Sequence, residues 1–181
     1  MKKWRLINTK LLCSSDFLSI FDDTVVLPSG KTIEYSKIML KDFVSVLPII
    51  NDDKIVMIEI LRYPRNCSSL EIPSGHIEKE EKPKDSAFRE LVEETGYRPG
   101  KLVSMGCFHP LSRSTQQAYL FFATDLKNGT QKLEETEQIN VKLVPTSNIE
   151  KMLTDNIVTH APTLLALQRY LLMKYVGLSF S

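Results

Sequence analysis

The sequence predicts a mixed α+β domain that is preceded by an antiparallel N-terminal strand region. Three observations predict this fold class: residues 4–61 form successive apolar runs separated by turn residues, shorter apolar runs follow later in the chain, and several stretches have the 3.6-residue period of helices. A chain of 181 residues is long enough for one domain with a full core and a modest extension. We therefore expect an N-terminal strand region at residues 1–42 and the main domain at residues 43–181.

Two antiparallel hairpins are expected early in the chain, because turn residues interrupt long apolar runs there. The turn PSG (28–30) separates FLSIFDDTVVL from KTIEYSKIML, and the turn NDD (51–53) separates FVSVLPII from KIVMIEIL. Pro83 suits the first turn of a helix, and Gly96 suits its C-terminal stop. Further strands are expected at residues 69–72, 102–108, 118–123 and 140–144. Helices are expected at residues 83–94, 147–153 and 162–176.

Composition and charge exclude several classes of protein. The 23 Lys and Arg residues nearly balance the 22 Asp and Glu residues, so the chain has no overall positive field to hold a nucleic acid. No apolar run is long enough to cross a bilayer, and the start MKKWRLINTKLL lacks the apolar core of a signal peptide. The three cysteines are widely separated and lack CxxC pairing, which favours incidental thiols in a reducing cytosol. We expect a cytoplasmic protein that binds neither nucleic acid nor a membrane.

The helix expected at residues 83–94 carries a concentrated group of carboxylates. Its apolar stripe consists of Ala87, Phe88, Leu91 and Val92. At 100° per residue, Glu90 and Glu94 lie side by side along one edge of this stripe, and Glu93 lies further round beside Arg89. Carboxylates at these spacings repel one another, and a divalent cation turns that repulsion into attraction. The pattern suits Mg²⁺ or Mn²⁺, although glutamate pairs on helices are more often solvated surface charge.

The segment from Gly75 to Tyr97 resembles the Nudix box, whose pattern is G-x5-E-x7-R-E-U-x-E-E-x-G-U with U a bulky apolar residue. The fixed positions that match are Gly75, Glu81, Arg89, Glu90, Glu93, Glu94 and Gly96. Tyr97 is aromatic where an aliphatic residue is usual. The resemblance implies a Nudix fold, an α/β/α sandwich with a mixed sheet, and a metal-dependent enzyme. In this interpretation Gly75 allows a tight loop, and Arg89 pairs with a carboxylate and fixes its rotamer.

The flanks of the box resemble the ADP-ribose pyrophosphatase branch of the Nudix family. In ILRYPRNCSSLEIPSG, Arg62 takes the place of an arginine that ends a Gln-Tyr-Arg-like strand, and Ser74 takes that of the residue whose backbone carbonyl is a metal ligand. Tyr35 falls where some members stack an aromatic ring on adenine, and Pro110 in SMGCFHPLSRSTQQAYLFFA falls at the branch's marker proline. Together with Arg113, these positions give a substrate-binding set. Ordinary edge-strand charge at Arg62 and plain packing at Tyr35 are the alternatives.

The segment LEETEQINV resembles the acidic loop that precedes the last strand in these enzymes. By that resemblance Glu135 is the general base and Glu137 is a further metal ligand, whereas the alternative is an exposed acidic turn. Arg89 and Glu93 complete the expected catalytic group. The resemblance implies two or three Mg²⁺ ions, held by Glu90, Glu93, Glu94, Glu137 and the carbonyl of Ser74.

The expected reaction is hydrolysis of the diphosphate linkage of ADP-ribose or a related ADP-sugar, which gives AMP and a sugar phosphate. The branch uses its N-terminal strands to form a dimer and to complete the substrate pocket, so a homodimer is expected. Two alternatives remain. In the first, the substrate is another nucleotide-sugar, a dinucleoside polyphosphate or an oxidised nucleoside triphosphate. In the second, the chain is a Nudix-fold module that binds a ligand without catalysis.

Overall fold

The computed structural model describes residues 1–133, 135 and 137–178, and the chain divides into two compact units. The N-terminal unit contains Met1–Asp42 and Phe108–Ala118. The main unit contains Phe43–Cys107 and Tyr119–Ser181. A segment from the second half of the chain therefore belongs with the N-terminal strands.

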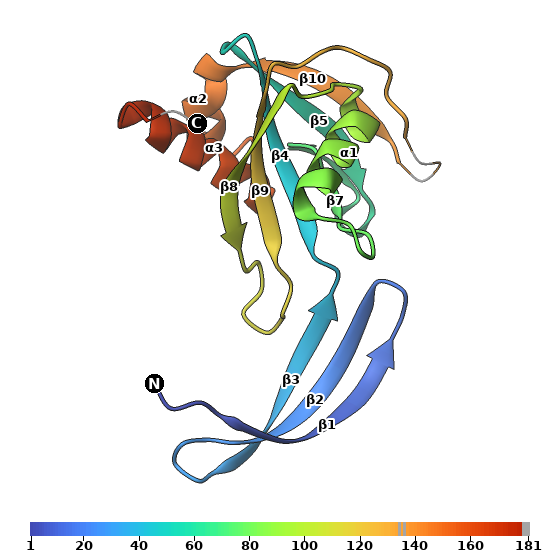
Figure 1. Cartoon of the computed structure of the whole chain (residues 1–181), viewed down its shortest axis with the longest axis vertical. Helices are drawn as coiled ribbons and strands as arrows, with labels where there is room; N and C mark the ends of the chain where they lie inside the picture. The colour runs from blue at the N-terminus through green and yellow to red at the C-terminus, as the bar shows by residue number, and fades with distance from the viewer. Residues whose placement is uncertain (134, 136, 179–181) are drawn as a thin grey trace. The chain divides into compact units, whose positions relative to one another are not determined.

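The N-terminal unit is an antiparallel sheet with the strand order β1-β2-β3 (Figure 1). Its strands are β1 (Arg5–Ser14), β2 (Leu18–Val26) and β3 (Thr32–Leu40). The expected β2–β3 hairpin is confirmed, and Gly30 in its turn has a φ of 86°, which glycine adopts without strain. The Ile38 amide donates to the Arg113 carbonyl at 2.9 Å and attaches the segment 108–118 to β3. Every residue of β1 is exposed, the apolar ones included.

The main unit is built on one sheet with the order β10-β5-β4-β9-β8, to which β6 adds beside β5 and β7 beside β4. The strands are β4 (Phe43–Ile50), β5 (Lys54–Arg62), β6 (Cys67–Glu71), β7 (Ser74–His76), β8 (Lys101–Phe108), β9 (Ala118–Thr124) and β10 (Ile139–Pro145). The expected β4–β5 hairpin is confirmed. Asn51 and Asp52 in its turn have φ values of 49° and 59°, a conformation that Asn and Asp tolerate better than most residues.

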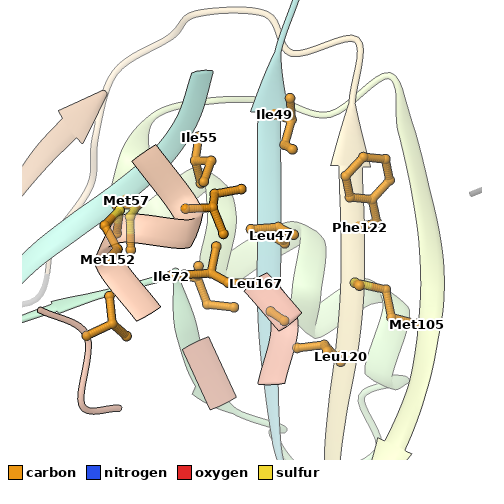
Figure 2. Close-up of a cluster of buried hydrophobic side chains, with 13 residues drawn as sticks. Leu47, Ile49, Ile55, Met57, Ile72, Met105, Leu120, Phe122, Met152 and Leu167 are labelled. Atoms are coloured by element: carbon orange, nitrogen blue, oxygen red, sulfur yellow. The ribbon is translucent and has the colours of Figure 1, made fainter. Parts of the chain in front are cut away.

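Helices cover both faces of this sheet, as Figure 1 shows. They are α1 (Pro83–Thr95), α2 (Ile149–Thr154) and α3 (Ala161–Tyr175), with 3-10 turns at Tyr63–Arg65 and Thr146–Asn148. Side chains alternate along β4, so Val44 and Val46 pack with α1, whereas Leu47 and Ile49 pack with α2 and α3 (Figure 2). This arrangement confirms the expected α/β/α sandwich. None of the described helices combines the length and the apolar character that a membrane span needs.

Helix α1 confirms the predicted helix but is rotated about its axis relative to the predicted stripe. Pro83 occupies its first turn, and the Gly96 amide caps it by donating to the Val92 carbonyl at 2.8 Å. Phe88, expected in the apolar stripe, is 38% exposed, so that part of the prediction is wrong. The buried face is instead centred on Ala87, Leu91 and the carboxylate edge, which brings acidic side chains into the interior.

Candidate active site

A polar pocket of about 270 Å³ lies in the main unit between the end of β5, β7 and α1. It brings together eight residues that the sequence analysis selected: Arg62, Ser74, Gly75, Arg89, Glu90, Glu93, Glu94 and Glu137. A larger cavity of about 440 Å³ beside α3 contains none of them, so volume alone does not identify the site. The acidic pocket is the candidate active site because the selected carboxylates meet there.

Glu94 is the most deeply buried carboxylate of the pocket, with 2% of its surface exposed. Its Oε2 accepts a hydrogen bond from the Ser74 amide at 2.8 Å, which ties α1 to β7. Burial raises the pKa of Glu94 well above its usual value, and the nearby charges of Glu90 and Glu137 raise it further. The Ser74 hydrogen bond and the charge of Arg62 lower it by less. The pocket therefore lacks the positive charge that ionised Glu94 requires.

Glu90 lies beside Gly75 at a distance that leaves no room for a side chain. A Cβ at Gly75 would fall 2.0 Å from the carboxylate carbon of Glu90. The φ of Gly75 is not in the left-handed region, so the close approach, and not the tight loop expected from the sequence, is what requires glycine. Burial raises the pKa of Glu90 to about 7, against the opposing effect of Arg89, whose Nη1 donates to Glu90 at 2.8 Å.

Arg89 connects the loop before α1 to the carboxylates of the helix. Its Nε and Nη2 donate to the two carboxylate oxygens of Glu81 at 2.9 and 3.0 Å, and its Nη1 donates to Glu93 at 3.0 Å. A further bond runs from Nη2 to the His76 carbonyl at 3.0 Å. The hydrogen bond from Arg89 lowers the pKa of Glu81. Arg89 is therefore placed to orient carboxylates, as the sequence analysis expected.

The chemistry of the pocket fits a hard divalent cation. Its candidate ligands are all oxygen atoms, and two of its carboxylates are buried with raised pKa values, as expected for sites short of positive charge. Among the described residues no three acidic, histidine or cysteine side chains converge as closely as a bound ion requires. Since Arg89 holds both Glu90 and Glu93, a cation competes with this arginine for its ligands.

The two acidic residues of the loop before β10 are placed differently. Glu137 lines the pocket, whereas Glu135 is an exposed turn residue that is not part of the pocket wall. Residues 134 and 136 of the same predicted loop lie outside the described residues. Lys132, a basic residue that also lines the pocket, was not predicted, because a lone lysine in a polar loop carries no pattern.

The start of this loop is fastened to the C-terminal end of α1. The Lys132 amide donates to the Glu93 carbonyl at 2.9 Å, and Nε2 of Gln131 donates to the Glu94 carbonyl at 2.6 Å. Two glycines touch beside these bonds: a Cβ at Gly96 would lie 2.8 Å from the carbonyl oxygen of Gly129, and a Cβ at Gly129 would lie 2.7 Å from that of Gly96. The helix that carries the box glutamates therefore also positions the loop that leads to Glu137.

Arg62 lines the pocket but is bound to a residue that the sequence analysis did not select. Its Nε and Nη2 donate to the two carboxylate oxygens of Glu71 at 3.0 and 2.5 Å. Glu71 is fully buried. The available signal was its place in LEIPSG, where a charged residue interrupts an apolar run just before the box.

The remaining expected substrate-binding residues lie in the N-terminal unit. The guanidinium of Arg113 lies 4.5 Å from the ring centroid of Tyr35, and its Nη1 donates to the Ser36 carbonyl at 3.1 Å. Trp4, which the sequence analysis missed, packs edge-on against Tyr35 with 5.6 Å between ring centroids. Pro110 is exposed in the segment 108–118. The structure thus brings Tyr35 and Arg113 together with Trp4, and Arg62 belongs to the other unit.

Known proteins resemble this chain over half of its length or more. The NUDIX domain family matches residues 39–167 of the chain. The ADP-ribose pyrophosphatase of Bacillus subtilis (strain 168) is 31% identical over 173 residues, which cover 94% of this chain and 93% of that protein. A methanol dehydrogenase activator of Bacillus methanolicus is 41% identical over 93 residues, which cover 51% of this chain and 50% of that protein.

Among solved structures, the crystal structure of an ADP compounds hydrolase superposes with a TM-score of 0.84 at 19% identity and covers 98% of this chain and 96% of that one. This likeness supports the fold. Nudix hydrolases generally need a divalent metal ion, which agrees with the chemistry of the pocket. Because the family match spans most of the chain and contains the complete box, the chain belongs to the Nudix family and is a Nudix hydrolase.

Proposed function

We propose that this Nudix hydrolase cleaves the diphosphate linkage of ADP-ribose or a related ADP-sugar and releases AMP and a sugar phosphate. One observation carries the proposal. The family match begins at residue 39, whereas the similarity to an ADP-ribose pyrophosphatase covers 94% of the chain and so extends into the N-terminal strands. The likeness to that enzyme therefore exceeds what the shared family fold explains.

The charge of the pocket supports a substrate that arrives with cations. A diphosphate is strongly negative, and Glu90, Glu93, Glu94 and Glu137 would repel it without compensation. We assign two or three Mg²⁺ ions to these carboxylates and the Ser74 carbonyl. When bound, such ions neutralise phosphate oxygens and lower the pKa of a water molecule.

Residues of the chain perform the remaining steps. Arg62 contributes a positive group to the pocket wall and contacts the diphosphate. Arg89 holds Glu81 and the helix carboxylates in register, which keeps the ligands preorganised. We assign acceptance of the proton of the attacking water to Glu135, whose exposed carboxylate lies on the loop that the Lys132–Glu93 bond anchors.

The N-terminal unit supplies the adenine contact and the dimer contact in this proposal. The Tyr35 ring, with Arg113 beside it and Pro110 in the same unit, provides a surface on which a base can stack. The edge strand β1 exposes Leu6, Ile7, Leu11 and Leu12, an arrangement that favours pairing with a second copy of the chain. Cys13, Cys67 and Cys107 are exposed free thiols, in keeping with a cytoplasmic location.

A panel of ADP-sugars, other nucleotide-sugars, dinucleoside polyphosphates and nucleoside triphosphates, assayed with Mg²⁺ and with Mn²⁺, tests the proposal. AMP and ribose 5-phosphate from ADP-ribose are the expected products. Release of pyrophosphate from a triphosphate as the fastest reaction would reassign the substrate, and ligand binding without turnover would indicate a non-catalytic module.

Two variants separate the metal site from the fold. Glu94→Gln keeps the size of the side chain and an oxygen that can accept from the Ser74 amide, so the fold should persist while turnover falls at least about 100-fold. The matched control is Glu59→Gln, at a half-buried carboxylate that pairs with Lys142 at 3.2 Å outside the pocket. Equal activity of the two variants would contradict the assignment of Glu94.

A further inference from the structure

A buried carboxylate, Glu71, lies behind the pocket residue Arg62. Glu71 belongs to β6, which pairs antiparallel with β5, and Arg62 is the last residue of β5. Glu71 is fully buried, whereas the side chain of Arg62 is 36% exposed and lines the pocket. One end of this ion pair is therefore in the interior and the other end is at the candidate active site.

The two side chains form a bidentate contact, called the fork below, that fixes the orientation of the Arg62 guanidinium as well as its distance from Glu71. Nε and Nη2 of Arg62 donate to the two oxygens of Glu71 at 3.0 and 2.5 Å. A guanidinium is planar and has five N–H groups, so a carboxylate on the Nε edge determines where the Nη1 edge points. Two N–H groups form the fork, which leaves the Nη1 edge for a second anion.

Besides Arg62, Glu71 has a neighbour at the start of α3. Nδ1 of His160 lies 3.2 Å from Glu71 Oε2 and 2.9 Å from the hydroxyl of Thr163, which in turn accepts from the Ile72 amide at 3.0 Å. These contacts connect the start of α3 to β6, the strand that carries Glu71.

The pocket carboxylates compete with Glu71 for the same arginine. Glu94 and Glu137 both attract the charge of Arg62 across the pocket. An Arg62 that was free to turn would pair with them and occupy the oxygen atoms that a cation needs. The fork with Glu71 prevents this, because it holds the Nε edge of the guanidinium away from the pocket carboxylates.

We propose that Glu71 is a positioning residue that aims Arg62 at the diphosphate of the substrate and keeps it off the pocket carboxylates. The inference rests on the proposed function for the identity of the anion. Glu71 itself touches neither substrate nor cation. Its loss should act on substrate binding and on the metal requirement, through Arg62.

The test is a double-mutant cycle with Glu71→Gln and Arg62→Lys, in the full chain, with ADP-ribose and Mg²⁺. Lysine keeps the charge of Arg62 but cannot form the fork. Each single variant should raise KM about tenfold and change kcat by less than about threefold, because an interaction made equally in the ground and transition states affects KM alone. Half-saturation should also need more Mg²⁺ in Glu71→Gln.

The decisive result is the double variant. If Glu71 acts only through Arg62, the double variant should have the KM of Arg62→Lys alone, whereas independent effects would multiply to about 100-fold. Multiplied effects would overturn the proposal. Where Glu71→Gln does not fold, Glu71→Asp replaces it in the same cycle, since it keeps the buried charge and shortens the reach to Arg62.

Two controls exclude a merely structural effect. Thr163→Val removes the hydroxyl behind Glu71 but leaves the fork, so the melting temperature should fall while KM stays unchanged. Glu59→Gln makes the same chemical change on a half-buried carboxylate of β5 outside the pocket and should leave KM unchanged. A KM rise in Thr163→Val equal to that in Glu71→Gln would assign the effect to the fold and overturn the proposal.

Calorimetric binding of ADP in the presence of Mg²⁺ separates this inference from the proposed function. Weaker ADP binding in Glu71→Gln and Arg62→Lys, without ADP-ribose turnover by the native chain, would leave the positioning role standing and remove the proposed reaction. Turnover of ADP-ribose by the native chain, with equal ADP affinity in all variants, would leave the proposed reaction standing and remove the positioning role of Glu71.

Discussion

Replacing Gly75 with alanine should separate catalysis from folding, because the added methyl group collides with a single functional side chain. The new Cβ would lie 2.0 Å from the Glu90 carboxylate carbon and Oε1 and 2.2 Å from Oε2, whereas real Cβ contacts are essentially never shorter than 3.0 Å. The carboxylate must therefore move by the difference between 2.0 and 3.0 Å, at least about 1 Å.

A displacement of this size is large for a metal ligand and small for the fold. Ligand distances in metal sites vary by only about 0.2 Å, and a misplacement of about 1 Å in an active site can cost about 100-fold in rate. We expect kcat/KM to fall about 100-fold or more. Burial already disfavours the Glu90 charge, and Arg89 keeps its fork with Glu81, so the free energy of unfolding should fall by only about 1 kcal/mol.

Steady-state hydrolysis, a Mg²⁺ activation curve and thermal melting together measure both effects. Gly100→Ala is the matched control, because its Cβ would lie 2.8 Å from Asp125 Cβ and Gly100 is not part of the pocket wall. The control should lose stability and keep its activity. If Gly75→Ala has native kcat/KM and an unchanged Mg²⁺ activation curve, then Glu90 is not a metal ligand whose position depends on its contact with Gly75.

Three further outcomes are expected. Glu135→Gln should lower kcat by about 100-fold or more with KM nearly unchanged, and a change in KM alone would move the general base elsewhere. Burial lowers the pKa of His160 to about 4, so between pH 6.5 and 4 the unfolded chain binds a proton there that the folded chain does not, and the free energy of unfolding falls as the pH drops, by up to about 3 kcal/mol. Glu90, with a pKa raised to about 7, changes the free energy of unfolding with the opposite sign over this pH range. The measurement is therefore the difference in urea unfolding between the native chain and His160→Gln at each pH. Identical dependence of the free energy of unfolding on pH in the two proteins would contradict the lowered pKa of His160. Leu11→Glu on the exposed face of β1 should halve the sedimenting mass if β1 forms the dimer contact, whereas Leu143→Glu, an exposed leucine of β10, should not change it.

Local patterns predicted most of the secondary structure because each pattern has a local physical cause. The hairpins followed from turn residues between apolar runs, and α1 followed from Pro83, Gly96 and its helical period. Strand β7 has only three residues, too few for a period, and was not predicted. The burial of Glu90 and Glu94 and the exposure of Phe88 depend on how α1 packs on β4, which no helical projection contains.

Contacts between distant segments set the limit of prediction for the site. The Nudix box located the pocket carboxylates, since their spacing is a property of one helix. The fork between Arg62 and Glu71 depends on the pairing of β5 with β6, and the contact of Trp4 with Tyr35 crosses most of the N-terminal unit. The sequence shows where these four residues lie along the chain, but no local pattern in it indicates which of them are in contact.

The contact between Gly96 and Gly129 has a consequence for how this sequence can change. A side chain at either glycine would push apart two backbone segments that are in contact. Glycine is therefore required at both positions together, although only Gly96 belongs to the box. Insertions between residue 129 and Lys132 would shift the acidic loop against α1, whereas added length after Lys132 would leave that attachment intact. Related enzymes with different substrates are therefore expected to vary in loop length after this attachment and to keep the glycine pair.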